Sequence, residues 1–365
     1  MYYEKELQAL KYSSRYRERE VFDECVIDLA SNDYLGLAEN KELLELTCKE
    51  LQEYKIHAPK ASMLVNGYHK IHQNFERALC KANGFEAGVV LGSGFNANIA
   101  LIEALVRKKD TLFIDEKYHA SGQLAAGNVQ GQVVYFKHND AQDLKDALRE
   151  NSSKRSIIAV EGIYSMDGDL MNREIFQLAE EFNTLLIIDE AHSSGVIGEK
   201  LMGVYEYFNI SIKPNHIKMG TLGKAYGSFG GYILASEHII DYLVNRAKPI
   251  IYATAPSLFD TLLAHKALEY ILQNYKAFHV KIQERQKSVK NLLGITCKGL
   301  IVAIPIGDND KVKAIQKEFL RENFLVGAIR QPTVERAIIR LIARLGVDDE
   351  VFEKALSNLA TILKK

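Results

Sequence analysis

The sequence predicts an α/β fold in which helices cover both faces of a mainly parallel, seven-stranded sheet. Seven short apolar runs rich in β-branched residues indicate the strands, and most are separated by segments of helical periodicity such as NANIALIEALVRK and NREIFQLAEEF. Strands that alternate with helices form parallel sheets, because each crossover lays a helix against the sheet. The predicted strands are residues 87–92, 111–115, 132–136, 156–162, 184–189, 216–220 and 230–235.

Further elements are predicted in the sequence before and after these strands. Residues 1–20 have the pattern of a helical arm, and CVIDLASNDYLGL joins a short strand to a turn. Beyond residue 245, long helical segments precede two further strands in GLIVAIPI and AIIRLIA. A chain of 365 residues exceeds the usual size of one compact domain. We therefore predict an arm and strand over 1–40, a large α/β domain over 41–244 and a smaller C-terminal α+β domain over 245–365.

Composition points to a small-molecule partner. The 46 Lys and Arg residues nearly balance 47 Asp and Glu, so the chain carries no overall field that would attract nucleic acid or an anionic membrane. Four scattered cysteines form no CxxC pair, which suits free thiols in a reducing compartment. The N-terminus lacks the apolar core of a signal peptide, and no apolar run reaches membrane-spanning length. We expect a cytoplasmic protein without a nucleic-acid or membrane partner.

Unusual residues cluster where the predicted strands end. Ligands of open parallel sheets bind beyond the carboxyl ends of the strands, so these segments are expected to meet at one edge. They are Gly92 to Asn98, Asp115 to Ser121, Glu161 to Asp169, Asp189 to Gly198, and Lys224.

The turn GSGFNAN opens a helix and offers backbone N–H groups to an anion such as phosphate. Gly92, Gly94 and Ala97 also satisfy a relaxed GxGxxA dinucleotide pattern, with Asp115 at the end of the next strand. A dinucleotide-dependent oxidoreductase is therefore one alternative. Ordinary turn chemistry explains the glycines equally well.

The segment LLIIDEAHSSGVIG places Asp189 directly after an apolar strand. Its DEAH letters suggest a nucleoside triphosphatase, but the GxxxxGK[ST] phosphate loop is absent, since Lys218 and Ala225 occupy two of its positions in KMGTLGKA. A helix-capping role for Asp189 remains open.

Lys224, in TLGKAYGSFGG, is surrounded by residues with almost no side chain, which suggests that something large approaches the backbone. A lysine desolvated against a bound ring can form a Schiff base, although an isolated lysine is more often a solvated charge. Lys224 and Asp189 together favour pyridoxal phosphate (PLP). This cofactor needs a lysine for its aldehyde, a carboxylate for its ring nitrogen and donors for its phosphate.

The histidines admit two interpretations. His119, in DEKYHAS, suits a helix cap or a ring stacked on a cofactor. His57, His69 and His72 lie close together in the sequence, but no carboxylate or cysteine completes a recognisable ligand set, so we predict no metal site.

Taken together, these motifs resemble the α-oxoamine synthases, a family of fold-type I PLP enzymes. The resemblance extends over nearly the whole chain, from SNDYLGLA through SGFNAN, DEKYHAS, EGIYSMDGD, DEAHSSGVIG and TLGKAYGSFGG to RQPTV. It implies the aspartate aminotransferase-like fold, PLP as cofactor, and an acyltransferase that condenses an amino acid with an acyl thioester and releases carbon dioxide. It also implies a homodimer with shared active sites.

Within the family, TLGKA and the KHND segment favour the branch that joins L-alanine to a pimeloyl thioester to give 8-amino-7-oxononanoate in biotin biosynthesis. Coenzyme A and acyl carrier protein both remain open as carriers of the acyl group. A glycine-using acetyl- or succinyltransferase, and a catalytically inactive partner subunit of the same fold, are the alternatives.

The resemblance also implies the roles of four catalytic residues. Lys224 matches the lysine that holds PLP and moves the α-proton of the substrate. Asp189 matches the partner of the ring nitrogen, and His192 matches the partner of the ring oxygen. His119 matches the histidine stacked on the ring.

Other positions match cofactor- and substrate-binding residues of the family. The cofactor positions are Gly94, Phe95, Ser165, Thr221 and Thr254, of which Thr254 is expected to reach the phosphate across a dimer interface. The substrate positions are Asn32 and Arg340, together with either Arg15 or Arg17. In APKASML, Met63 replaces an arginine of the family while Ser62 is retained, and we expect this departure to affect the acyl-chain preference.

Overall fold

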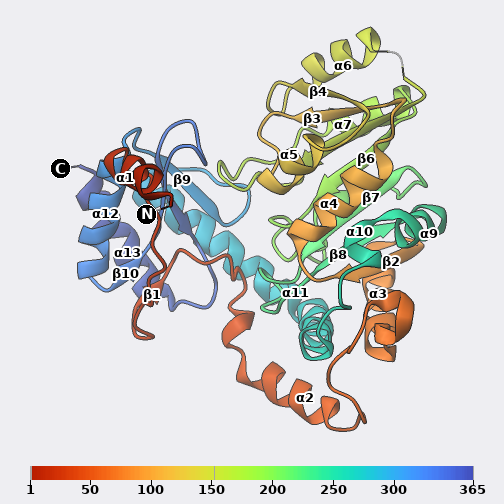
Figure 1. Cartoon of the computed structure of the whole chain (residues 1–365). Helices are drawn as coiled ribbons and strands as arrows, with labels where there is room; N and C mark the ends of the chain where they lie inside the picture. The colour runs from red at the N-terminus through yellow and green to blue at the C-terminus, as the bar shows by residue number, and fades with distance from the viewer. Residues whose placement is uncertain (1, 152, 365) are drawn as a thin grey trace. The chain divides into compact units, whose positions relative to one another are not determined.

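The computed structural model describes residues 2–151 and 153–364 (Figure 1). The chain divides into two compact units. The larger unit consists of residues 35–165 and 169–280, and the smaller one of residues up to 34, 166–168 and those from 281 onward. The boundary predicted near residue 245 differs from this division, because residue 245 lies inside the larger unit, in helix α9 (Glu237–Arg246).

The larger unit contains the predicted seven-stranded sheet. Its strands are β2 (Ala87–Leu91), β3 (Asp110–Asp115), β4 (Gln132–Phe136), β5 (Arg155–Glu161), β6 (Leu185–Asp189), β7 (His216–Thr221) and β8 (Gly231–Ala235). They are arranged in the order β2-β8-β7-β6-β5-β3-β4. Only β8 runs antiparallel to its neighbours, so the prediction of a mainly parallel sheet is confirmed.

Helices cover both faces of this sheet (Figure 1). Helices α4 (Gly94–Leu105), α5 (Ala120–Ala126), α9 and α10 (Lys248–Ile251) share one apolar core with alternate residues of the strands. Helix α6 (Ala141–Glu150) packs on β3 and β4, and α7 (Glu174–Glu181) packs on β6. The chain moves in one direction along the sheet from β3 to β4, and in the opposite direction from β4 to β5 and from β5 to β6. Since crossovers between parallel strands are right-handed, α6 and α7 lie on the face opposite to α5.

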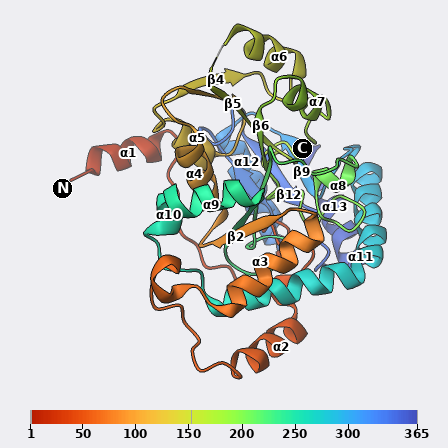
Figure 2. The same cartoon turned by 90° about the vertical axis from the view of Figure 1, so that its right-hand side faces the viewer.

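Helix α3 (Lys70–Asn83) lies along the edge strand β2 (Figure 2). The chain before it forms η1 (Leu37–Glu39), α2 (Lys41–Leu51) and η2 (Met63–Gly67). Helix α8 (Val204–Tyr207) follows β6, and α11 (Leu258–Leu293) continues from the larger unit into the smaller one. Side-chain caps define several helix starts: the Oγ atom of Ser93 accepts from the N–H of Asn96 at the first turn of α4.

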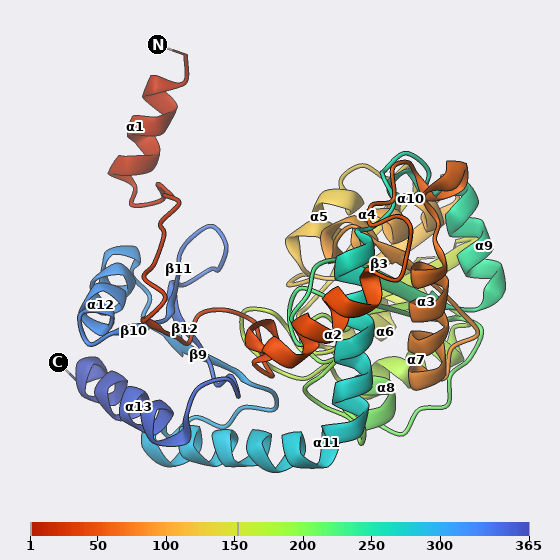
Figure 3. The ribbon, with the colours of Figure 1, turned by 90° about the horizontal axis from the view of Figure 1, so that it is seen from below.

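The smaller unit is an α+β assembly (Figure 3). Strands β9 (Ile301–Pro305), β11 (Gly327–Ile329) and β12 (Ile338–Ile342) form an antiparallel sheet in the order β11-β12-β9. Helix α12 (Asn309–Arg321) packs on this sheet and on α13 (Asp349–Leu363). A parallel pair joins β1 (Ile27–Asp28) to β10 (Phe324–Leu325), which brings the N-terminal segment to the C-terminal one.

The N-terminal helix is shorter than the sequence predicts. Helix α1 covers only Glu4–Tyr12, not residues 1–20. Ser14 adopts a left-handed conformation with φ 54°, which ends the helix, and no residue of α1 is buried. A helix of this length without a packed face gains too little to continue through Arg15 and beyond.

The cysteines are free thiols, as predicted. None of the helices in the described ranges combines the length and apolar character required to cross a membrane.

Candidate active site

Chemically useful side chains meet at the carboxyl edge of the large sheet. Strand β5 ends at Glu161 and β6 ends at Asp189, and these two residues are direct partners in the parallel register. Strand β7 ends at Thr221, three residues before Lys224. The structure therefore brings together the strand ends that the sequence predicted to share one edge.

Lys224 lies in a tight turn after β7, where the N–H of Gly227 donates to its carbonyl oxygen at 2.9 Å. Its Nζ atom is 2.7 Å from Nε2 of His192. The lysine side chain is half-buried, and His192 is buried in the turn that follows β6. An amine and an imidazole at this distance can exchange a proton directly.

Asp189 is only 4% exposed, and each oxygen of its carboxylate accepts a hydrogen bond. The N–H of Ala191 donates to Oδ1 at 2.9 Å, and Nδ2 of Asn98 donates to Oδ2 at 2.8 Å. The first bond is the local turn contact that a capping role would require. The second comes from a different element, helix α4, and fixes the direction of the carboxylate.

Asn98 is the centre of a buried network that the sequence analysis did not assign. It accepts from the hydroxyl of Tyr118 at 2.6 Å and donates to Oγ of Ser121 at 2.9 Å. Oγ of Ser121 in turn lies 2.7 Å from Nδ1 of His119. Asp189 and His119 are thus connected through Asn98 and Ser121. Helix α4 also contains Asn96 and Glu103, so no pattern in the sequence distinguished Asn98 from its polar neighbours.

His119 occupies the position before α5, as the interpretation of this residue as a helix cap requires. Its Nδ1 accepts from the N–H of Ser121 at 3.3 Å, which is a helix cap. Burial lowers the pKa of the imidazole, and the charge of Lys224 lowers it further, while Asp189 opposes the shift. His119 is therefore favoured in its neutral form, which suits stacking on a ring.

The N-terminus of α4 faces the same edge. Gly94 and Phe95 occupy its first positions, where backbone N–H groups have no partner within the helix. A Cβ atom built on Gly94 would lie 3.2 Å from Cβ of Thr221, so α4 approaches the end of β7 closely. This helix end offers donors and a positive partial charge to an anion.

The glycines around Lys224 serve mainly the packing of the protein itself. A Cβ atom on Gly220 would collide with the ring of Tyr232, and one on Gly231 would lie 2.6 Å from the backbone nitrogen of Gly94. Gly227, with φ 57°, packs against the backbone of Leu37 and Ala38. The interpretation of this segment as room for a ligand is therefore wrong for these three positions. Gly223, in contrast, has only ordinary contacts.

Glu161 and Ser165 form a second part of the site. The N–H of Ser165 donates to Oε2 of Glu161 at 2.9 Å, and both residues are buried. Oε1 of Glu161 has no hydrogen-bond partner within the described ranges. Burial raises the pKa of the Glu161 carboxyl well above its ordinary value, and the charge of Asp189 raises it further. The sequence placed Glu161 at a strand end but gave it no role.

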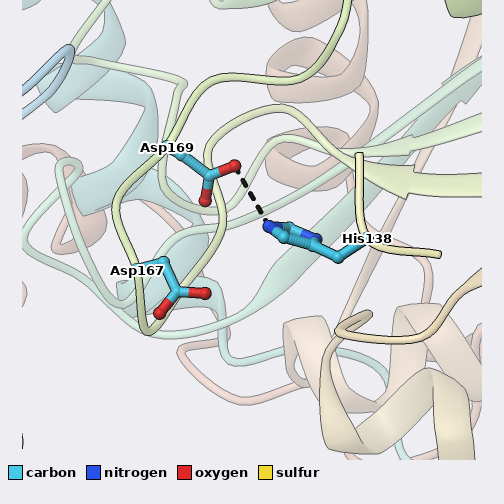
Figure 4. A group of neighbouring side chains, drawn as sticks. All are labelled: His138, Asp167 and Asp169. Atoms are coloured by element: carbon cyan, nitrogen blue, oxygen red, sulfur yellow. Dashed lines mark hydrogen bonds and ion pairs between the residues drawn. The ribbon is translucent and has the colours of Figure 1, made fainter. Parts of the chain in front are cut away.

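Asp115 is fully engaged by the protein, which weakens the dinucleotide alternative. Its carboxylate accepts from the hydroxyl of Tyr164 at 2.7 Å and from the N–H of Asn139 at 2.7 Å, and lies 3.0 Å from Nδ1 of His138. A ribose-binding acid needs a free oxygen. Nε2 of His138 also lies 3.1 Å from Asp169 (Figure 4). This histidine therefore bridges the carboxylates of Asp115 and Asp169 and connects the loop after β5 to β3.

Thr254 is exposed and lies beside the APKASML segment. It forms an isolated antiparallel bridge with Ser62, and the N–H of Ala255 donates to the carbonyl oxygen of Ala61 at 3.0 Å. Met63 packs against the apolar core between the sheet and α4. The residue that replaces the family's arginine thus has a packing role in this chain.

The predicted substrate residues lie in the smaller unit. Arg340 is buried in β12, paired in register with Ala303 and Gly327. Asn32 is half-buried, and its Oδ1 accepts from the hydroxyl of Tyr34 at 3.4 Å. Of the two N-terminal arginines, Arg17 donates to Oγ1 of Thr333 at 2.9 Å.

A buried arginine that the sequence analysis missed also lies in this unit. Arg344 donates to Asp28 at 3.1 Å and to Asp33 at 2.8 Å. No local pattern in the sequence distinguishes it from Arg340.

Two of the clustered histidines stabilise the start of α3. Nδ1 of His69 accepts from the N–H of Ile71 at 3.3 Å, and Nδ1 of His72 accepts from the N–H of His69 at 3.0 Å. Nε2 of His72 lies 2.9 Å from the carbonyl oxygen of Pro256.

These residues fit PLP on chemical grounds. One sheet edge carries a lysine amine, a buried and oriented carboxylate, a histidine and a helix N-terminus. Among the residues that the structure describes, none bonds to the buried Oε1 atom of Glu161 at this edge. The aldehyde of PLP matches the lysine amine, and its ring nitrogen matches the carboxylate. The ring face matches the histidine, and the phosphate matches the helix N-terminus.

Comparisons with known proteins agree with this chemistry. A family profile described as "Aminotransferase class I and II" matches residues 24–359. The 8-amino-7-oxononanoate synthase of Helicobacter pylori (strain ATCC 700392 / 26695) is 42% identical over 341 residues, which cover 93% of this chain and 91% of that protein. A putative 8-amino-7-oxononanoate synthase of Aquifex aeolicus (strain VF5) is 36% identical over 372 residues, which cover 99% of this chain and 98% of that protein.

Solved structures share the fold over almost the whole chain. The 8-amino-7-oxononanoate synthase of Francisella tularensis has a TM-score of 0.77 at 25% identity, covering 94% of this chain and 99% of that one. A serine palmitoyltransferase from S. paucimobilis, solved with PLP and myriocin bound, has a TM-score of 0.89 at 20% identity and covers 99% of this chain and 96% of that one.

Proposed function

The chain belongs to the class I and II aminotransferase family and, within it, to the 8-amino-7-oxononanoate synthases, and on this basis we propose that it condenses L-alanine with a pimeloyl thioester. The reaction releases carbon dioxide and the thiol and gives 8-amino-7-oxononanoate for biotin biosynthesis. The observation that carries the proposal is the placement of Lys224, His192 and the oriented Asp189 at one sheet edge.

Lys224, Asp189, His192 and His119 would hold PLP, the cofactor of this family. Lys224 supplies the amine for the aldehyde, and Asp189 supplies the negative charge for the ring nitrogen. His192 would bond to the ring oxygen, and His119 would lie against the ring face. When bound, the cofactor withdraws electrons from the amino acid, so that its α-proton becomes acidic. Gly94 and Phe95, with Ser165, Thr221 and Thr254, complete the set of cofactor-binding residues.

Asp189 would keep the cofactor's ring nitrogen protonated, because a buried carboxylate stabilises a positive charge strongly in a site that excludes water. Its two hydrogen bonds, from Ala191 and Asn98, hold the carboxylate in one direction. The side chain therefore acts as a preorganised charge.

Lys224 moves the α-proton of the substrate. Nζ lies 2.7 Å from Nε2 of His192, and this pair can share a proton while the amine receives one from the α-carbon. Arg340 and Asn32 are the proposed partners of the substrate carboxylate, supported by the buried position of Arg340 and the half-buried position of Asn32.

The acyl group and its carrier form the finer part of the proposal. We propose that the enzyme is a cytoplasmic homodimer with shared active sites, and the exposure of Thr254 supports its contact with a partner subunit. Met63 packs against the apolar core where the family has an arginine, so the charge of that arginine is missing from this position, which favours an uncharged segment of the acyl donor nearby. Coenzyme A and acyl carrier protein are the two candidate carriers.

The test is a matched assay of the PLP-loaded protein. L-alanine with pimeloyl-CoA, L-alanine with pimeloyl acyl carrier protein, and glycine with acetyl-CoA are each incubated with the enzyme, and the product is identified by mass. We expect 8-amino-7-oxononanoate from one or both pimeloyl donors and little product from glycine. Efficient condensation of glycine alone would instead support the glycine-using branch of the family.

A further inference from the structure

Glu161 is a buried acid that the proposed mechanism leaves without a role. Glu161 is the last residue of β5 and lies directly beside Asp189, the last residue of β6. It is only 1% exposed. Neighbouring strands are about 4.8 Å apart, so the two side chains leave the same face of the sheet side by side. Glu161 also bonds the N–H of Ser165, so it lies between two residues that the proposal assigns to the cofactor.

The two oxygens of Glu161 have different surroundings. Oε2 accepts from the N–H of Ser165 at 2.9 Å. Oε1 is buried and has no hydrogen-bond partner in the part of the chain that the structure describes. A buried polar atom without a partner is costly, and native structures rarely leave one unless a ligand or water completes it. Oε1 therefore points to a ligand at this edge of the sheet.

The charges around Glu161 determine its protonation. The carboxylates of Asp189 and Asp115 disfavour a negative charge on Glu161, whereas the charge of Lys224 favours it. The buried phenols of Tyr118 and Tyr164 also interact with the Glu161 carboxyl. Two adjacent buried carboxyls do not both ionise readily.

Asp189 accepts two N–H donors, from Ala191 and Asn98, whereas Glu161 accepts one. The better-stabilised anion is therefore Asp189. The proton shared by the two strand ends belongs on Glu161, and its carboxyl then has an O–H group to donate.

We propose that Glu161 stays neutral and donates a hydrogen bond from Oε1 to the cofactor bound between Asp189 and Lys224. This inference rests on the proposed function, since it requires PLP at the site. It makes Glu161 a further cofactor-binding residue that contributes a donor and no charge. Of these two strand ends only Asp189 is then ionised, so the pair presents one negative charge to the cofactor.

A neutral donor and an ionised acid have opposite spectroscopic consequences. An anion at Glu161 would stabilise the protonated form of the nitrogen that joins Lys224 to PLP, and its removal would lower the pKa of that nitrogen. A neutral carboxyl has no such effect. Glu161→Gln keeps the shape, an acceptor for Ser165 and a donor, so it separates the two cases without a large change in packing.

The experiment compares the wild-type holoprotein with Glu161→Gln and Glu161→Leu in the absence of substrate. The pH dependence of the visible absorbance gives the pKa of the Lys224-bound cofactor, and titration of the apoprotein gives the Kd for PLP. We expect Glu161→Gln to match the wild type in both. Glu161→Leu should bind PLP about tenfold more weakly, the usual consequence of one lost hydrogen bond. Difference infrared spectra should contain a protonated-carboxyl band that is missing from Glu161→Gln.

Three outcomes would overturn the inference. In Glu161→Gln, a fall of about one unit or more in the spectroscopic pKa would mean that Glu161 is ionised. An unchanged Kd in a folded Glu161→Leu would mean that Oε1 does not contact the cofactor, and an unaltered infrared band in Glu161→Gln would assign that proton elsewhere. If the wild type itself formed no visible absorbance with PLP, the proposed function would fail, and this result is distinct from the other three.

Discussion

Nδ2 of Asn98 donates a hydrogen bond to Oδ2 of Asp189 at 2.8 Å, and this contact joins helix α4 to the end of strand β6. The same asparagine accepts from Tyr118 and donates to Ser121. Because all of these groups are buried, none of their hydrogen bonds is readily replaced by water. The carboxylate proposed to bind the ring nitrogen is therefore oriented by a residue that need not contact the cofactor.

Replacement of Asn98 by alanine should weaken PLP binding. The change removes a donor to a buried carboxylate, and such a bond contributes about 1.5–3 kcal/mol, which corresponds to roughly a ten- to hundredfold loss. The Kd for PLP of the apoprotein measures this, and kcat should fall as Asp189 becomes free to rotate. Asn96→Ala, on the same helix turn, is the matched control and should stay within about twofold of the wild type. Equal losses in the two variants would contradict the role given to Asn98.

Lys224→Ala and His119→Phe should separate covalent binding from ring stacking. Without the amine, no side chain at this position can bond the aldehyde or move the α-proton, so we expect turnover to be lost. Phenylalanine keeps an aromatic face against the ring, and we expect His119→Phe to retain roughly 1–10% of kcat. Borohydride reduction followed by peptide mapping should find the cofactor on Lys224 in His119→Phe. Comparable residual rates in the two variants would refute the assigned roles.

Most of the large sheet was predictable because its strands are short, apolar and interrupted by helix-forming segments. All seven predicted runs are strands, with limits that differ by a residue or so, as 156–162 became Arg155–Glu161. The prediction of a helical arm over residues 1–20 was too long, because this helix has no buried face, and α1 ends at Tyr12. The limits of the units were not predictable, since β1 pairs with β10 from the far end of the chain.

Residues of the proposed site could be named from the sequence only where a residue type carries its own chemistry. Lys224, Asp189, His192 and His119 are such residues, and the structure brings their strand ends together. Asn98 has no distinctive spacing, and its importance depends on contacts that only the folded chain creates. For the same reason, the glycines near Lys224 suggested an open space, although several of them are packed against protein atoms.

Glu76→Gln should make the unfolding free energy of the protein less dependent on pH. Burial raises the pKa of the Glu76 carboxyl to about 7, although hydrogen bonds from Tyr68 and the N–H of Val90 lower it. A carboxyl with a raised pKa stabilises the fold fully below its unfolded pKa of about 4.5 and loses this contribution as pH rises through 7. The wild type should therefore lose about 3 kcal/mol relative to Glu76→Gln between pH 4.5 and 8.

Urea unfolding of the two apoproteins at several pH values measures this difference. Glu45→Gln replaces an exposed carboxyl in α2 and should track the wild type at every pH. A constant difference between wild type and Glu76→Gln across this range would show that Glu76 is ionised throughout, and the burial argument would then fail.

His138→Asn should destabilise the fold mainly at neutral and acidic pH. The imidazole bridges Asp115 and Asp169 and its side chain is 17% exposed. Burial disfavours its charge, but the two carboxylates outweigh that effect and raise the pKa of His138 to about 9. A histidine with a raised pKa stabilises the fold fully below its unfolded pKa of about 6.5 and loses this contribution as pH rises through 9. Asparagine keeps a polar side chain but carries no charge at any pH.

The wild type should therefore exceed His138→Asn by about 1–3 kcal/mol in unfolding free energy at pH 6, and this margin should shrink toward zero by pH 10. Urea unfolding of the apoproteins across this range provides the measurement, and His57→Asn, at an exposed histidine, is the control. Since His138 ties the loop that carries Ser165 to the end of β3, PLP affinity should decline over the same pH interval in the wild type and stay flatter in the variant. A margin that widened with pH would mean that His138 is neutral in the folded protein and that the two carboxylates are held by other groups.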